Sequence, residues 1–64
     1  MYFMIDIQVS NKTMQFTGHW LTECESWMAA MKSAYRYADM FMRLNSCNKI
    51  DYINVTERKA CNGK

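Results

Sequence analysis

The sequence predicts an α+β domain with element order ββαβ, in which one long helix packs on one face of a three-stranded antiparallel sheet. Two patterns carry this prediction. Apolar and polar residues alternate along residues 2–9, 13–17 and 49–56, as in strands with one buried face. Residues 23–45 contain no glycine or proline and repeat apolar residues at helical spacing. A right-handed connection over the sheet places the third strand beside the first, so the expected strand order is 2-1-3.

The first two strands are expected to form a hairpin, because the residues SNK at positions 10–12 favour a turn. The apolar side chains of the first strand share one face, which consists of Phe3, Ile5, Ile7 and Val9. Gly18 interrupts the second alternating segment, so we expect the second strand to end at Thr17. Trp20 is then expected in the loop before the helix.

Thr22 and Glu25 have the spacing of a capping box, which predicts that the helix starts near residue 23. At about 100° per residue, one arc of this helix is apolar and is expected to face the sheet: Trp27, Met31, Ala34, Ala38 and Phe41. The small Ala34 and Ala38 would let the helix lie close to the sheet. Residues 45–48 end the helix, since asparagine tolerates the left-handed conformation that a helix exit often needs.

The third strand, residues 49–56, is rich in β-branched residues. Its alternation places Ile53 and Val55 on one face and Ile50 and Tyr52 on the other. Residues 57–64 are polar and are expected to form a frayed tail. The sequence therefore predicts a single domain over residues 1–56.

Composition and charge exclude several classes of protein. Half of the residues are apolar and 22% are charged, which argues against a disordered chain. No segment approaches the ~20 consecutive apolar residues of a membrane span, and Asp6 interrupts the apolar N-terminus too early for a signal peptide. Three cysteines at wide spacing suit reduced thiols, so we expect a cytoplasmic protein with no membrane partner. A net charge of +2 does not by itself imply a nucleic-acid partner.

The shortness of the chain predicts a partner. In a domain of 64 residues, the burial of apolar surface barely offsets the conformational entropy that is lost on folding. We therefore expect a partner chain to add stability, with a homodimer as the expected oligomer.

Few residues are available for catalysis. The chain has one histidine, His19, and nucleophilic catalysis needs a base within hydrogen-bond reach of the nucleophile. Cys24 would lie in the first helical turn, where a thiol is activated, but it shares the apolar arc with Trp27, so core packing is the preferred interpretation. The other thiols, Cys47 and Cys61, lack the ligand spacing of a zinc site. The sequence thus predicts no enzyme, no metal site and no cofactor.

Lys32, Arg36 and Arg43 share one face of the predicted helix. Like charges one helical turn apart disfavour a helix unless an anion lies over them, so this face could receive the phosphates of a nucleic acid. Asp39 and Glu25 are interleaved with these cations, which favours a solvated face instead.

Surplus apolar surface is the main functional signal. One helix covers only one face of the predicted sheet, yet the other face carries Tyr2, Met4, Ile50 and Tyr52. A second helical stripe lies outside the main apolar arc and consists of Tyr37, Met40 and Leu44. Trp20 is a third candidate. Methionine and aromatic side chains at this density are typical of adaptable recognition surfaces, so these residues are expected to bind a protein partner and to mediate self-association.

A hairpin, then Trp27, Ala30, Ala34 and Ala38 on a long helix, then the last strand KIDYINV, resembles many small proteins encoded by phages. Among these are host-takeover proteins, anti-CRISPR proteins and phage antitoxins. The resemblance lies in size, element order and methionine content over most of the chain, and no functional residue is carried over from it. It implies an inhibitor that occupies a surface of a larger host protein, in the cytoplasm of the host cell. The sequence therefore predicts a small non-enzymatic protein-binding module, with nucleic-acid binding through the basic helix face as the alternative.

Overall fold

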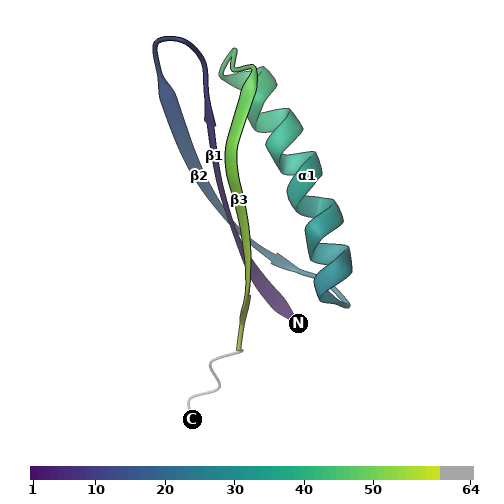
Figure 1. Cartoon of the computed structure of the whole chain (residues 1–64). Coiled ribbons are helices and arrows are strands. Elements are labelled where there is room, and N and C mark those ends of the chain that lie inside the picture. Colours follow the sequence, from purple (N-terminus) through teal and green to yellow (C-terminus); the bar gives the residue numbers. More distant parts are fainter. Residues whose placement is uncertain (60–64) are drawn as a thin grey trace.

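The computed structural model describes residues 1–59 and shows two layers, a sheet and one helix that runs along its face (Figure 1). In chain order the elements are β1 (Tyr2–Ser10), β2 (Gln15–Glu23), α1 (Trp27–Leu44) and β3 (Lys49–Arg58). The strand order is β2-β1-β3, and both strand pairs are antiparallel. The predicted α+β class, the element order and the strand order are confirmed.

The core lies between β1 and α1. The alternate side chains predicted to share one face of β1 are fully buried: Phe3, Ile5, Ile7 and Val9. On the helix side, three alanines are also fully buried: Ala30, Ala34 and Ala38. Because a methyl group is small, this face lets the helix backbone approach the sheet closely. Larger side chains from the helix and the outer strands pack around this centre.

β2 is longer than predicted, because Gly18 does not end it. The strand continues to Glu23, and Gly18 stands opposite Ile7 in an unbroken register with β1. A Cβ atom at position 18 would lie 2.5 Å from Cη2 and 2.9 Å from Cζ3 of Trp20. The glycine therefore provides the space in which the indole lies. Trp20 is part of β2, and its predicted place in a loop is wrong.

The indole of Trp20 is held by two rings from the helix. It stacks on Tyr37 with 5.6 Å between ring centroids and meets the edge of Phe41 at 5.2 Å. All three side chains pack against the buried core. This aromatic cluster joins β2 to α1.

The helix starts later than predicted, at Trp27. Ser26 is the N-cap, and its hydroxyl accepts a hydrogen bond from the amide of Ala29 at 3.2 Å. The predicted capping box of Thr22 and Glu25 is wrong, because pairing with β1 keeps the chain extended as far as the Cys24 amide, which donates to the Met1 carbonyl. At residues 22–24, pairing with β1 therefore outweighs the local preference for a helix start.

The helix ends at Leu44, within the predicted stretch. The carbonyl of Phe41 accepts from the backbone amide of Asn45 at 3.2 Å and from its side-chain amide at 2.9 Å, so Asn45 closes the last turn. The left-handed residue at the exit is Ser46, with a φ angle of 55°, rather than one of the asparagines.

A β-bulge in β3 changes the predicted face of Ile50. The register pairs Val9 with Ile50 and Gln8 with Tyr52, which leaves Asp51 as an extra residue. Directly opposed residues share a face of the sheet, so Ile50 lies on the helix side with Val9. Its predicted position beside Tyr52 is therefore wrong, since alternation fails across a bulge. Ile53 and Val55 pack against the core, as predicted.

The end of the chain differs from the prediction in part. β3 continues through Glu57 to Arg58, so these two residues belong to the sheet and not to a frayed tail. They pair with Phe3 and Tyr2 of the central strand. The rest of the predicted tail from residue 60 onwards lies outside the described residues.

Gly18→Ala is expected to destabilise the domain by about 1–3 kcal/mol, because the added methyl group must displace an indole held between two rings. Urea unfolding followed by circular dichroism measures the change. The exposed Asn54→Ala control is expected to change stability by less than about 0.5 kcal/mol. In a Trp20→Ala background most of the cost of Gly18→Ala should disappear, because only the contact of the added methyl group with Cζ of Phe41 at 3.2 Å remains. An equal cost in both backgrounds would contradict the steric explanation.

Candidate functional site

Large apolar side chains remain exposed on both flanks of α1. Tyr35 lies about 100° to one side of the buried Ala34 around the helix axis, and Leu44 lies about 80° to the other. Met28 and Tyr35 lie on the first flank, with exposed fractions of 68% and 59%. Together with Trp27 at the start of the helix, which is 53% exposed, they form the N-terminal apolar patch. On the second, the C-terminal apolar patch consists of Met40 and Leu44, with exposed fractions of 47% and 74%.

The exposure of Trp27 corrects its predicted place in the core. Helical side chains lean towards the N-terminus of the helix, and Trp27 is the first helical residue. Its indole therefore projects past the start of the helix instead of under it. Met28 and Tyr35 were not expected at an interface, although Tyr35 lies next to the buried Ala34 and hence at the border of the apolar arc.

The second stripe predicted on the helix is divided by the structure. Met40 and Leu44 are exposed as expected, but Tyr37 is only partly exposed and stacks on Trp20. The ring stacking and core packing give Tyr37 and Trp20 a structural role in joining β2 to α1. The contacts of Tyr37 and Trp20 do not test their predicted role in partner binding.

On the outer face of the sheet, opposite the helix, cross-strand neighbours form rows that run across the strands and are either apolar or polar. The apolar row places Met4 beside Leu21, which is 60% exposed. The next row is polar, since Asp6 lies between His19 and Asn54. Nδ1 of His19 is 2.5 Å from Oδ1 of Asp6. This polar row interrupts the apolar surface that the sequence predicts on this face.

Two tyrosines predicted for partner binding stand at the ends of the outer face. Tyr2 lies between Glu23 and Arg58, and Tyr52 lies beside Gln8, beyond the polar row. Both rings are exposed, with fractions of 41% and 40%. Tyr2 and Tyr52 are therefore accessible, but they belong to separate small patches.

The basic side chains of the helix form a ridge between the two apolar patches. Lys32, Arg36 and Arg43 are all exposed, and their spacing turns them away from the sheet. Arg43 bonds Asp39 one turn earlier at 3.3 Å, so part of its charge is already compensated. Among the described residues, Lys32 and Arg36 form no salt bridge.

The thiols and the histidine do not meet. Cys24 lies after the end of β2 and before the helix, so its predicted place in the first helical turn is wrong. The extended chain between His19 and Cys24 spans roughly 16 Å, which is far beyond hydrogen-bond reach. Cys47 packs against the core, and Cys61 lies outside the described residues.

We searched residues 1–59 for groups that could hold a metal ion and for a helix that could span a membrane. Within this range, no group of three or more histidine, cysteine or acidic side chains is placed to hold a metal ion. The helix that the structure describes is not apolar enough along its length to cross a bilayer.

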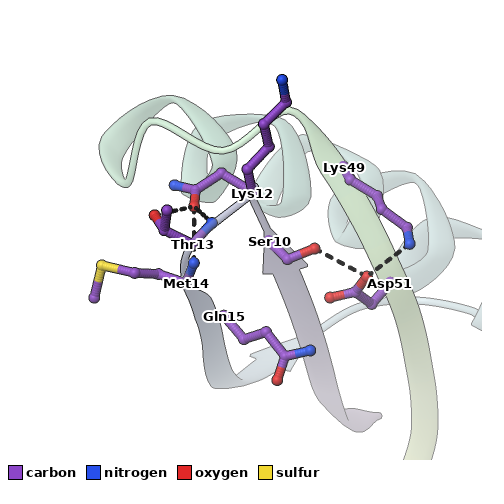
Figure 2. A pocket seen from close by; sticks show the side chains of 8 residues that line it. Ser10, Lys12, Thr13, Met14, Gln15, Lys49 and Asp51 are labelled. Carbon is purple, nitrogen blue, oxygen red and sulfur yellow. Dashed lines mark hydrogen bonds and ion pairs between the residues drawn. The ribbon is translucent and has the colours of Figure 1, made fainter.

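A polar depression of about 590 Å³ lies beside the hairpin turn (Figure 2). Asn11 shapes the turn, because its side-chain oxygen accepts hydrogen bonds from the amides of Thr13 and Met14, both at 2.9 Å. At the other side of the depression, Asp51 accepts from the hydroxyl of Ser10 at 3.1 Å and lies 3.7 Å from Nζ of Lys49. The Asp51 carboxylate is thus already bonded within the chain.

Comparison with known proteins adds no relative, since no protein-family model, curated protein or solved structure matches this chain. The case for a function therefore depends on the surfaces described above.

Asp51→Ala is expected to cost about 1–2 kcal/mol of stability. The buried Ser10 hydroxyl and the side-chain amide of Gln8, which donates to Asp51 at 3.1 Å, would both lose their acceptor. Asp39→Ala is the matched control, because it breaks an exposed ion pair worth less than about 1 kcal/mol. Urea unfolding of both variants checks the difference, and equal losses would contradict a bonded structural role for Asp51.

Proposed function

We propose that this chain is a small protein-binding module that occupies a surface of a larger protein and performs no chemistry of its own. The observation that carries the proposal is the exposure of the two apolar patches, which consist of Trp27, Met28, Tyr35, Met40 and Leu44, on one helix of 18 residues. A small soluble domain gains no stability from leaving such side chains in water. Tryptophan, tyrosine and methionine are also the residue types that contribute most to recognition surfaces.

The chemistry of the helix surface indicates the kind of partner. Between the apolar patches runs the basic ridge of Lys32, Arg36 and Arg43, with Asp39 as the acidic residue beside it. A complementary surface would carry apolar pockets next to acidic side chains. We therefore propose a protein partner with an acidic, apolar groove that receives the outer surface of the helix.

An inhibitor of the phage type is the biological role that fits this proposal. A chain of 64 residues can act by covering a functional surface of a larger host protein, and the resemblance in size and element order supports that role. The proposed compartment is the cytoplasm of the host, where the free thiols Cys24 and Cys47 would stay reduced.

Met28→Glu is expected to reduce capture of the target at least about tenfold, because it places a charge inside the N-terminal apolar patch. The experiment uses the full chain as bait in host lysate, followed by mass spectrometry and by repetition with the purified protein that is captured. The matched control is Met14→Glu, since Met14 is 55% exposed and lies in the hairpin turn away from the helix. Circular dichroism verifies that both variants are folded.

Three other outcomes would contradict the proposal. Equal capture by both variants would place the binding surface elsewhere, and greater loss with Met14→Glu would place it at the hairpin turn. Nuclease-sensitive capture that survives Met28→Glu but is lost in Lys32→Ala/Arg36→Ala would favour the nucleic-acid alternative. In that case the affinity would also fall steeply as salt concentration rises.

A further inference from the structure

The outer edge of β2 presents unpaired backbone groups. The Cys24 amide donates to the Met1 carbonyl and the Asn11 amide donates to the Met14 carbonyl, which extends the β1–β2 register at both ends. Hydrogen-bonded pairs alternate along an antiparallel ladder, so even-numbered residues of β2 bond β1. The odd-numbered residues direct their N–H and C=O groups away from the sheet: Gln15, Thr17, His19, Leu21 and Glu23. Within residues 1–59, these outward groups form no backbone hydrogen bond, because β2 pairs only with β1.

The two edges of the sheet differ in how they are protected. β3 carries a bulge at Asp51 and charged residues at both ends, namely Lys49, Glu57 and Arg58. Bulges and charges are the usual means by which an edge strand is kept from pairing with another chain. β2 has no bulge, no proline and no lysine over nine residues, and its one charged residue apart from the histidine is Glu23 at its end. The edge of β2 is therefore the one open to a further strand.

The helix also leaves apolar groups uncovered on the β2 side. The flank of α1 that carries Leu44 and Met40 also carries Tyr37, and Tyr37 stacks on Trp20 of β2. This flank therefore faces the β2 edge. Phe16 and Trp20 pack against the core from β2 but remain partly exposed.

We propose that a second copy of this chain occupies this edge. β2 of one copy pairs antiparallel with β2 of the other, which makes a continuous sheet of order β3-β1-β2-β2-β1-β3 with both helices on the same face. In a register centred on His19, the five residues with free backbone groups pair only with one another. This register forms about ten backbone hydrogen bonds, two for each hydrogen-bonded pair. It uses the whole length of the strand and leaves no overhang.

Charge complementarity favours a second copy over an unrelated strand. The pairing places Glu23 at the end of one β2, and Glu25 two residues beyond it, towards the turn of the other copy, which carries Lys12. Two-fold symmetry forms this contact twice, as isologous interfaces require.

The proposed dimer shares one surface with the proposed function, because the flank of α1 that carries Met40 and Leu44 faces the β2 edge. The dimer still rests on the backbone of β2 and not on that function. Met28 lies on the other flank of the helix, away from β2, so it stays accessible in the dimer. A failure of dimerisation would leave the capture experiment unaffected, and the reverse also holds.

His19→Lys is expected to convert the dimer to a monomer, with a dissociation constant raised at least about tenfold. His19 pairs with itself at the two-fold axis, so the substitution places two ammonium groups opposite each other. The matched control is Asn54→Lys, because Asn54 flanks Asp6 from β3 as His19 flanks it from β2. Size-exclusion chromatography with light scattering, and sedimentation equilibrium, give the mass in solution of the wild type and of each variant. A monomeric wild type, or equal weakening by both variants, would overturn the proposal.

Amide hydrogen exchange tests the register directly. In the dimer, the amides of Thr17, His19 and Leu21 are expected to be protected, and their protection should fall as the protein is diluted. The outward amides of β3, Ile53 and Val55, are expected to exchange fast at every concentration. Fast exchange at the β2 edge in the isolated protein, with protection only after a captured target is added, would assign the edge to strand addition by that target and would overturn the dimer.

Discussion

The close packing of three helix alanines on the central strand determines where most other side chains lie. Ala30, Ala34 and Ala38 bring the helix backbone near β1, and the space between them and the strand is filled by the four buried side chains of β1. Several bulky side chains of α1 lie on its flanks, where some pack against the core and others are exposed. The exposed patches follow from the narrowness of the core.

The β2 side of the molecule shows how the fold compensates for this narrow contact. The helix alone does not cover the edge strand, and an indole from β2 reaches up to it. Trp20 can do so because Gly18 leaves room on the strand and because Tyr37 and Phe41 hold the ring from above. Two residues of β2 and two of α1 thus act as one packing unit. The glycine serves the packing of its neighbour and not the conformation of its own backbone.

The sequence predicts the parts of the fold that depend on regular alternation. The buried face of β1 and the helix face that carries Ala34 and Ala38 follow from spacing. The order of the strands follows from the right-handed connection over the sheet. Spacing is not informative where a tertiary contact competes with a local preference. Strand pairing with β1 carries the chain past Gly18 and past the expected capping box, and the bulge at Asp51 reverses the face of Ile50. The exposure of the residues on the flanks of the helix also depends on how close the helix lies to the sheet, and a local sequence pattern does not predict that distance.

The two tryptophans end up in opposite surroundings, although both lie near the start of the helix in the sequence. Trp20 packs between two aromatic rings and is only partly exposed, whereas Trp27 is 53% exposed at the start of α1. Their emission spectra should therefore separate, with a blue-shifted component from the first and a red-shifted component from the second. One fluorescence trace can then report on the integrity of the interior and on events at the helix tip without any added label.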